Sequence, residues 1–411
     1  MTGTALARVV GPVSTFADTH WGRTPLLSRA ADLGGPDGFT GLLSAAAVDE
    51  LLSRRGLRTP FLRVAQQGSV LPAGRFTGGG GAGAEIADQV IDEQVMRLYA
   101  DGATLVLQGL HRIWPPLIDF AGELGTELNR PLQVNAYLTP PASQGFATHY
   151  DTHDVFVLQV DGRKRWCIHP PVLPDPLERQ AWGGRADEVA ATARGEPALD
   201  VVLEPGDALY LPRGWLHSAR ALGGRSLHLT VGIRGLTRYA LVEELLALAV
   251  ADPRLRAGLP YGLDPGDPEA IGKELTETVT ALRDWLTTAD PAEVAARLRD
   301  RSWTAARPAP ISPLAQLDFA AALTPADRIV VRPGLHRELA AAGDEQAEGE
   351  DQVVLRLPGR ALRFPSYCEP AIRMALDGEA HAVGELPLAD DDDRLVLARR
   401  LLTEGLVVAS R

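Results

Sequence analysis

The sequence is poor in cysteine and has no long apolar run, and each shortage excludes a class of protein. Its 411 residues include two cysteines, Cys167 and Cys368, too far apart to suggest the disulfide framework of a small secreted domain. No apolar run approaches the roughly 20 residues that a membrane-spanning helix needs. Residues 1–20 contain one arginine and no unbroken apolar core, so they lack the pattern of a secretory signal. We therefore expect a cytoplasmic protein with no membrane partner.

Positive charge is also scarce. The 41 Lys and Arg residues are outnumbered by 53 Asp and Glu residues, which gives a formal net charge of -12. This charge disfavours direct binding to nucleic acid or to an anionic membrane and suits a basic partner. Only Lys164 and Lys273 are lysines, so arginine serves almost wherever a positive charge is needed. A lysine in such a chain indicates a specific steric need.

The length exceeds what one ordinary core accommodates, and the pattern of elements predicts an α+β protein of three domains. In the first, residues 1–235, helical elements precede a region rich in strands. The strands are expected at 132–138, 154–160, 163–168, 199–203, 208–211 and 225–233. Asp161-Gly162 lies between two of them and predicts a two-residue hairpin turn. Many short antiparallel strands with such turns are typical of a double-sheet jelly roll.

Beyond residue 235 the pattern changes to helices. Periodic apolar residues predict helices at 239–250, 271–287 and 291–299, and we expect the region 236–305 to mediate dimerisation. Residues 306–411 show the order strand, helix, helix and strand, which predicts a winged-helix-like domain. This last region mixes arginines with an equal or larger number of acids. A role in protein interaction or packing is therefore favoured over DNA binding.

A candidate metal site is formed by His149, Asp151 and His217. Residues i and i+2 of a strand point to the same face, so His149 and Asp151 can reach one ion, and His217 follows a Gly/Pro turn farther along. Two histidines and one carboxylate are the ligand set of non-haem Fe(II) oxygenases. His153 shares the strand parity, but a fourth ligand would block a co-substrate, so we expect it beside the ligands. No ligand spacing includes the remaining histidines, which we interpret as structural: His20, His111, His169, His228, His336 and His381.

The spacing Gly206-x5-Pro212-x-Gly214-x2-His217 matches the second cupin motif, and Val155 stands where four-ligand cupins carry a glutamate. The chain resembles the JmjC-type, 2-oxoglutarate-dependent oxygenases of the cupin superfamily and is most similar to the ribosomal oxygenases, which hydroxylate ribosomal proteins. The resemblance covers most of the chain: barrel, helical dimerisation region and winged helix, in that order. It implies Fe(II) at His149, Asp151 and His217.

The same resemblance implies further site residues. Lys164 matches the basic residue that binds the far carboxylate of 2-oxoglutarate. Strand alternation turns it inward while its arginine neighbours face solvent; the alternative is an exposed strand lysine. Asn135 and Tyr137 match residues near co-substrate and substrate. Thr230 is the candidate for a small hydroxyl residue lining the pocket, although Gly232 stands where a serine is expected. Trp215 either walls the site or fills the core.

The implied activity is hydroxylation of a protein or peptide side chain, such as His or Arg of a basic ribosomal protein, with Fe(II), 2-oxoglutarate and O₂. Four alternatives stay open: a catalytically inactive cupin module with a binding or regulatory role, a demethylase, an oxygenase of peptide natural products, and a non-oxygenase cupin such as an isomerase.

Overall fold

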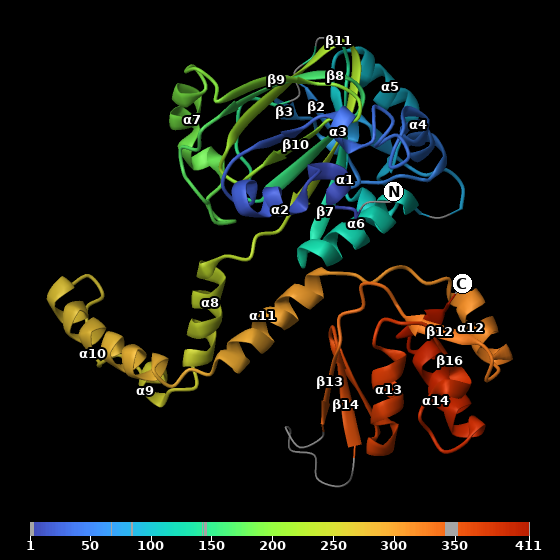
Figure 1. Ribbon diagram of the computed structural model, residues 1–411. Coiled ribbons are helices and arrows are strands. Elements are labelled where there is room, and N and C mark those ends of the chain that lie inside the picture. Colours follow the sequence, from blue (N-terminus) through green and yellow to red (C-terminus); the bar gives the residue numbers. More distant parts are fainter. Residues whose placement is uncertain are drawn as a thin grey trace. The chain divides into compact units, whose positions relative to one another are not determined.

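The structure is a computed structural model that describes residues 4–66, 68–83, 85–141, 143, 146–341 and 352–410. The chain forms two compact units, residues 1–235 and residues 236–411 (Figure 1). The boundary coincides with the expected change from strands to helices.

The first unit is built on a nine-stranded antiparallel sheet. The order is β1-β10-β8-β11-β7-β6-β2-β3, with β9 beside β8. Its strands are β1 (Leu26–Ser28), β2 (Leu62–Gln66), β3 (Ser69–Val70), β6 (Thr104–Leu107), β7 (Leu132–Thr139), β8 (Asp154–His169), β9 (Leu199–Leu203), β10 (Ala208–Leu211) and β11 (Leu216–Ile233). A separate pair joins β4 (Thr77–Gly78) to β5 (Gln89–Val90).

Two long strands, β8 and β11, hold the unit together. They pair along nearly their whole length, from Leu216 opposite His169 to Ile233 opposite Asp154. The first half of β8 also pairs with β10, whereas its second half pairs with β9. Each long strand therefore contributes to two sets of neighbours. This is how the strands of a jelly roll enclose a space between two walls.

The hairpin predicted at Asp161-Gly162 is wrong, because β8 runs straight through these residues. Gly162 has a φ of 66°, and a Cβ built there would lie 1.9 Å from the carbonyl oxygen of Arg225. The pairing register shifts opposite this point, between Leu222 and Leu227 of β11. Gly162 thus serves a β-bulge. A glycine bulge uses the same positive φ as a hairpin turn, so the sequence pattern does not separate the two.

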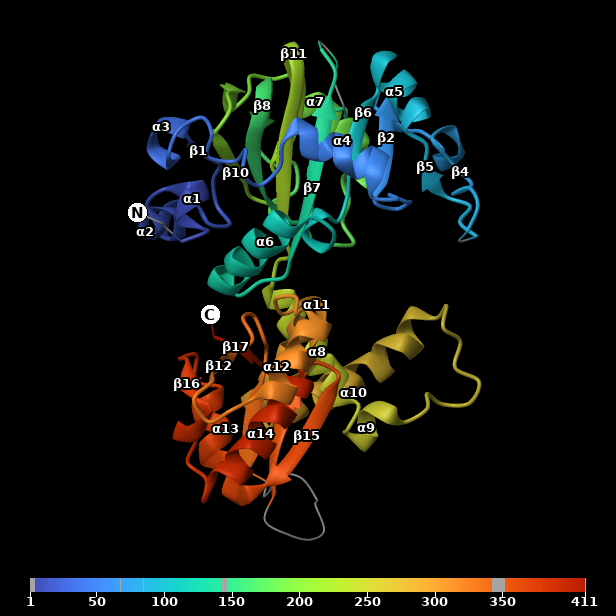
Figure 2. The same cartoon turned by 90° about the vertical axis from the view of Figure 1, so that its right-hand side faces the viewer.

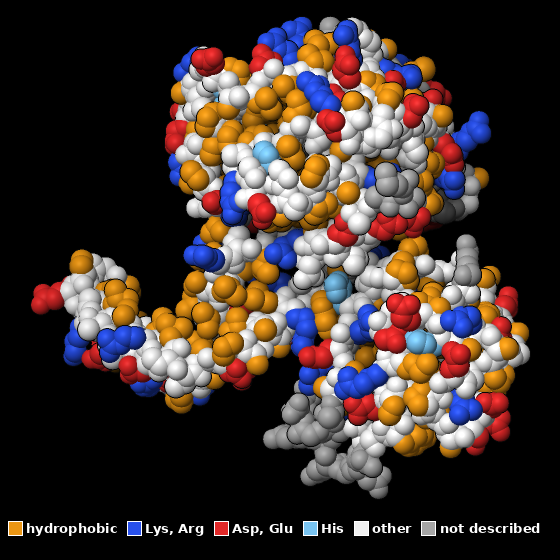
Figure 3. Space-filling view, in the orientation of Figure 1, with side chains coloured by type: hydrophobic (Ala, Val, Ile, Leu, Met, Phe, Trp, Pro, Cys, Tyr) orange, Lys and Arg blue, Asp and Glu red, His pale blue; other side chains and the backbone are white. Residues whose placement is uncertain are grey.

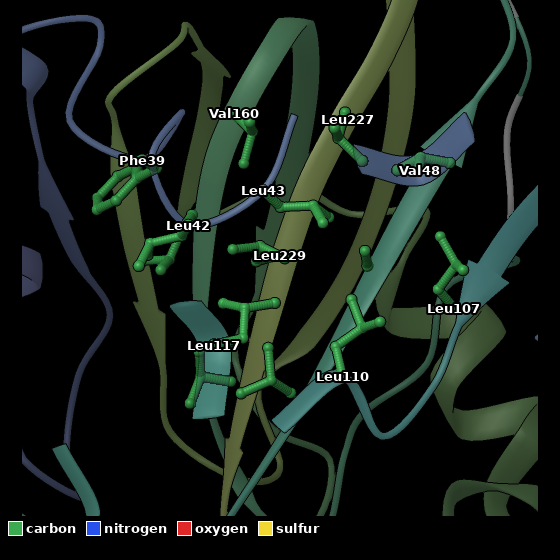
Figure 4. Close-up of a cluster of buried hydrophobic side chains, with 14 of the residues drawn as sticks. Phe39, Leu42, Leu43, Val48, Leu107, Leu110, Leu117, Val160, Leu227 and Leu229 are labelled. Atoms are coloured by element: carbon green, nitrogen blue, oxygen red, sulfur yellow. The ribbon is translucent and has the colours of Figure 1, made fainter. Parts of the chain in front are cut away.

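Helices cover one face of the sheet. In Figure 2, α4 (Ala45–Arg54) and α6 (Pro115–Leu128) cross in front of the strands. The remaining helices of the unit are α1 (Ala7–Val10), α2 (Val13–Thr15), α3 (Ala30–Leu33), α5 (Asp92–Ala100) and α7 (Ala186–Thr192). Leu117 of α6 and Val48 of α4 pack with Leu229 of β11 in one core (Figure 4). The core fills this side of the sheet, so the cavity lies on the other side.

The second unit begins with α8 (Arg238–Ala249), α9 (Pro253–Arg256), α10 (Pro268–Leu286) and α11 (Pro291–Ala305). Asp267 and Asp290 cap α10 and α11, each followed by proline in the first turn, a common way to start a helix. None of the described helices is both long and apolar enough to cross a membrane.

The rest of the second unit has its own core. It comprises α12 (Pro313–Ala322), α13 (Glu369–Ala375), α14 (Asp391–Thr403) and two three-stranded sheets. One sheet joins β16 (His381–Ala382), β12 (Arg328–Val331) and β17 (Val407–Ala409). The other joins β13 (Glu338–Ala341), β14 (Gln352–Leu357) and β15 (Arg360–Pro365). The predicted strands and helices are present; α12, β12, β13, β15 and β16 were not predicted.

Helix α8, predicted from its periodic leucines, is present and carries some of them at the surface. Leu241 and Leu246 are 42% and 48% exposed. The buried positions are instead Ala240, Glu244 and Ala249. Glu244 pairs with Arg297 of α11 at 2.8 Å. An ion pair between neighbouring helices thus lies on the buried side of α8, and these leucines are at the surface.

Candidate active site

The three predicted metal ligands lie together. The ligand atoms of His149, Asp151 and His217 are all within 4.8 Å of one another. The His217 Nε2 and Asp151 Oδ2 atoms are 3.6 Å apart, and the two imidazole centroids are 4.4 Å apart. The described residues form no other such group of three. One ion placed between them is within reach of all three side chains.

Main-chain hydrogen bonds set this spacing. His149 and His217 exchange two backbone hydrogen bonds, at 2.8 and 3.2 Å, so the two ligand-bearing segments form a short antiparallel bridge. The amide of Gly214 donates to the carbonyl of Asp151 at 2.9 Å. Gly214 has a φ of 87°, and a Cβ there would lie 2.7 Å from the carbonyl oxygen of Leu173. Glycine is therefore required where the chain turns toward His217.

A buried carboxylate ties the same two segments together. Asp154, at the start of β8, accepts from the amide of Arg213 at 2.8 Å and from the Tyr210 hydroxyl at 3.1 Å. Burial raises the pKa of Asp154, although both hydrogen bonds oppose the rise. Asp154 thus fixes the loop before His217 relative to the strand after Asp151.

Both imidazoles are oriented by backbone carbonyls. His149 Nδ1 lies 2.8 Å from the Ala147 oxygen, and His217 Nδ1 lies 3.1 Å from the Trp215 oxygen. If each Nδ1–H donates there, each Nε2 keeps a lone pair for a metal, as is usual for metal-binding histidines. Burial and then the nearby His149 lower the pKa of His217 to about 4, so its imidazole is neutral at ordinary pH.

The triad opens into a cavity of about 190 Å³, many times the volume that one buried water requires. Lys164 lines this cavity and is 3% exposed. Its Nζ donates to the Thr139 hydroxyl at 3.0 Å and lies 3.5 Å from His228 Nδ1. Burial lowers the pKa of Lys164 to about 7. The predicted inward direction of this lysine is thus the one observed, in the same cavity as the metal ligands.

The other predicted site residues also line the cavity. Thr230 of β11 lies opposite Asn135 of β7, in register. The side-chain oxygen of Asn135 accepts from the Gly109 amide at 3.1 Å. Tyr137 lies one alternation farther along β7, and burial and then Asp151 raise its pKa to about 12. Thr230 and Gly232 both face the cavity, because they are two residues apart on one strand.

His153 lies beside the ligands and outside the group of three. Its Nε2 is 2.9 Å from the Gln133 amide nitrogen, and its Nδ1 is buried without a partner. A Cβ on Gly232 would lie 2.8 Å from that Nε2, so glycine at 232 makes room for the His153 ring. Trp215 does not line the cavity. Its indole donates to the Arg23 carbonyl at 3.3 Å, and its ring packs on a hydrophobic cluster of the barrel.

Several cavity residues were missed from the sequence. His228, interpreted as structural, belongs to no candidate metal group but stands beside Lys164. Trp166 lies two residues from Lys164, on the same side of β8. Strand alternation carried one step further from Lys164 and Thr230 points to both. Arg63 and Phe146 come from distant segments, and the sequence carries no local signal for them.

The comparisons with known proteins agree with this geometry. Residues 124–241 match the JmjC domain family. A Drosophila persimilis protein named bifunctional lysine-specific demethylase and histidyl-hydroxylase NO66 is 31% identical over 273 residues, 63% of this chain. Human ribosomal oxygenase 1 is 32% identical over 264 residues, 61% of this chain. The matches span only 36% and 38% of those two relatives.

Solved structures extend the likeness to both units. The Escherichia coli ribosomal oxygenase YcfD covers 98% of this chain and 99% of its own, with 18% identity and a TM-score of 0.53. A complex of YcfD with cobalt and 2-oxoglutarate has a TM-score of 0.51 at 17% identity. At this identity the likeness establishes the fold alone. Residues 124–241 therefore carry a JmjC domain, and the fold of the chain is similar to that of a ribosomal oxygenase.

Proposed function

We propose that this chain is an Fe(II)- and 2-oxoglutarate-dependent dioxygenase that hydroxylates a side chain of a protein. One observation carries the proposal: His149, Asp151 and His217 bring their ligand atoms within 4.8 Å of one another, at a cavity that also holds the buried ammonium of Lys164. An iron ligand set and a carboxylate-binding cation in one space are what this chemistry needs.

The residues fit ferrous iron. Two imidazoles, each oriented through Nδ1, and one carboxylate provide three donors and leave the other coordination positions free. Val155 lines the cavity where a fourth, glutamate ligand would block a co-substrate. When bound, the iron couples oxidative decarboxylation of 2-oxoglutarate by O₂ to hydroxylation of a C–H bond. The protein holds the ligands, orients both substrates and excludes water.

Different cavity residues would contact different parts of 2-oxoglutarate. Lys164 pairs with the far carboxylate of 2-oxoglutarate, because its ammonium is buried with a hydroxyl partner and no carboxylate near it. Asn135 and Thr230 line the same cavity as Lys164 and the metal ligands and would contact the chain of the co-substrate. Tyr137, whose phenol stays protonated, closes that wall beside them.

We further propose a neutral target side chain. Among the described residues that line the cavity, Asp151 is the only carboxylate, whereas Arg63 and Lys164 are cationic. With Asp151 on the metal, a guanidinium or methylated ammonium would enter without a counter-charge, which is unfavourable in a desolvated site. This favours histidine over arginine, and hydroxylation over demethylation. A basic ribosomal protein suits the net charge of -12 as the carrier of that residue.

The second unit is proposed to assemble the enzyme. We infer three domains: the oxygenase at 1–235, a helical dimerisation region at 236–305 and a winged-helix-like domain at 306–411. Apolar side chains gather along α8 and α10 at the surface (Figure 3), among them Leu246 and Leu275, which are 48% and 57% exposed. A second copy of this chain would bury them. We place the enzyme in the cytoplasm and expect no direct contact with nucleic acid.

The test is anaerobic purification, addition of Fe(II) and measurement of succinate formed from 2-oxoglutarate, with and without proteins from dissociated bacterial ribosomes. Mass spectrometry then identifies the residue that gains an oxygen atom, or formaldehyde if a methyl group is removed. His149→Ala should abolish iron binding and succinate formation, whereas His169→Ala, a buried histidine outside the cavity, should retain both. Iron-dependent turnover that survives His149→Ala would refute the assignment. A wild-type protein that binds neither iron nor 2-oxoglutarate would favour an inactive cupin module.

A further inference from the structure

The segment that connects β8 to β9, residues 170–198, is anchored beside the metal ligands. Tyr150 and Leu216, each of which is next to a metal ligand in the sequence, form a small separate core with Val189 of α7. The Tyr150 hydroxyl also donates to the carbonyl of Gln180 at 2.8 Å. Buried contacts and a hydrogen bond therefore fix the 170–198 segment relative to the ligands.

This anchoring brings Trp182 next to a metal ligand. Its indole lies beside the His149 imidazole, with ring centroids 6.3 Å apart and planes at 50°. Phe146, which lines the cavity, lies 6.1 Å from the same imidazole, whereas Trp182 is not among the described residues that line the cavity. A protein substrate can insert only a side chain into a cavity of about 190 Å³, so the residues that flank its target must lie on the surface around the site. Trp182 is part of that surface.

Trp182 contributes little to the packing of the fold. The side chain is 37% exposed. In the part of the chain that the structure describes, its ring joins no hydrophobic cluster and its indole N–H has no hydrogen-bonding partner. Gly183 and Gly184 follow it, and a Cβ at either position would meet nothing within 4 Å. A large aromatic ring at the surface beside a reaction site is typical of a residue that dominates binding to a protein partner.

The charge around Trp182 favours a basic partner. In the 170–198 segment three arginines are outnumbered by five acidic residues: Asp175, Glu178, Asp187, Glu188 and Glu196. One of the arginines, Arg185, is itself paired with Glu188 at 3.0 Å. Tryptophan presents the aromatic face that attracts a cation most strongly. A lysine or arginine side chain therefore fits over this indole better than an acidic one.

We propose that Trp182 is a docking residue for the protein substrate, and that its indole holds a lysine or arginine near the target residue in the substrate chain. This inference rests on the proposed function and adds a requirement on the sequence around the target. The neutral target side chain enters the cavity, while its cationic neighbour stays at the surface, where it keeps contact with water and with the acidic 170–198 segment. A neutral target and a basic carrier protein are thus compatible.

Kinetics with proteins from dissociated bacterial ribosomes test the docking role. Trp182→Ala should raise KM for the modified ribosomal protein about tenfold or more and change kcat less than about threefold, because the indole binds away from the reacting atoms. Trp182→Phe keeps an aromatic face and should raise KM less. Met96→Ala removes a side chain that is 65% exposed on α5 of the same unit, and it should change neither constant. An unchanged KM in Trp182→Ala would overturn the inference and leave the oxygenase assignment intact.

Photo-crosslinking provides a second measurement that needs no turnover. Trp182→p-benzoylphenylalanine is irradiated with the same ribosomal proteins, Mn(II) and 2-oxoglutarate, with Met96→p-benzoylphenylalanine as the control. The first variant should crosslink to a peptide that contains lysine or arginine, and the second should not. If wild-type protein with Fe(II) forms no succinate, the proposed function fails, and the crosslinks decide the docking role separately. Crosslinks from neither position, or equally from both, would overturn it.

Discussion

Replacing Lys164 with methionine should stabilise the protein without ligands and abolish tight binding of 2-oxoglutarate. The side chain is 3% exposed, and burial lowers its pKa from 10.5 to about 7. That difference of about 3.5 pH units corresponds to about 5 kcal/mol at roughly 1.4 kcal/mol per unit. Local relaxation and water entry reduce the penalty, so we expect about 2–4 kcal/mol of added stability for Lys164→Met near pH 7.

The pH dependence gives this prediction its sign. The folded-state pKa of Lys164 is below its unfolded-state pKa, so the unfolded chain binds more protons between pH 7 and pH 10.5. Wild-type stability should therefore rise across that window, whereas Lys164→Met lacks this contribution. The gap between the two should be largest at or below pH 7 and should close toward pH 10.

Urea unfolding at several pH values measures the gap. Lys273→Met is the matched control, because Lys273 is the only other lysine and lies exposed on α10; it should change stability by less than about 0.5 kcal/mol. With Mn(II) and saturating 2-oxoglutarate the order should reverse, since only the wild type gains stability from tight co-substrate binding. A ligand-free Lys164→Met protein that is less stable than wild type at pH 7 would refute the claim that the buried Lys164 ammonium destabilises the protein in the absence of co-substrate.

Three further predictions test other parts of the structure. Asp154→Ala leaves the Arg213 amide and the Tyr210 hydroxyl proton without an acceptor, so it should cost about 2–4 kcal/mol and weaken metal affinity about tenfold or more. Unchanged iron titration and urea unfolding would contradict the proposed role of Asp154 in joining the two segments. Gly162→Ala places a Cβ 1.9 Å from the Arg225 oxygen and should cost about 3 kcal/mol or more, measured as a fall in the urea midpoint. Gly183→Ala, where a Cβ would meet nothing within 4 Å, is the control, and equal effects of the two substitutions would argue against the bulge. Leu246→Glu should convert the proposed dimer into a monomer, as measured by light scattering. Val396→Glu, at an exposed position of α14, should leave the dimer intact, and a monomeric wild type would refute the proposed dimer.

More of the candidate site than of the fold could be predicted from the sequence. Strand alternation turned Lys164 away from its arginine neighbours, because a period of two is fixed by the covalent geometry of an extended chain. The strand expected at His149 and Asp151 is not present: only His149 forms a one-residue bridge, and β8 begins at Asp154, although the two side chains do meet. The Gly/Pro spacing before His217 reflects a turn that only glycine at 214 permits. These patterns involve residues close together in the chain, so they can be recognised in a single sequence.

What was missed depends on contacts between distant segments. Gly162 was assigned to a hairpin, since nothing within β8 reveals that Arg225 lies against it. His228 was interpreted as structural because nothing local in the sequence shows that it lies beside Lys164, which is 64 residues earlier in the chain. The leucines of α8 predicted the helix, but they do not reveal which side is covered within the chain, which is the side of the Glu244–Arg297 pair. Register and partner choice are properties of the folded chain.

The paired backbone bonds between His149 and His217 have a consequence for metal identity. Because the main chain dictates the spacing of the donors, an incoming ion need not recruit them from a loose ensemble, and little of its binding free energy is spent on ordering. Ligand atoms whose spacing is fixed by the backbone set the coordination geometry, and they discriminate weakly among divalent ions of similar radius. Occupancy is then governed by the supply of each ion, and excess nickel or cobalt should displace iron from the site by competition that is reversible on exchange.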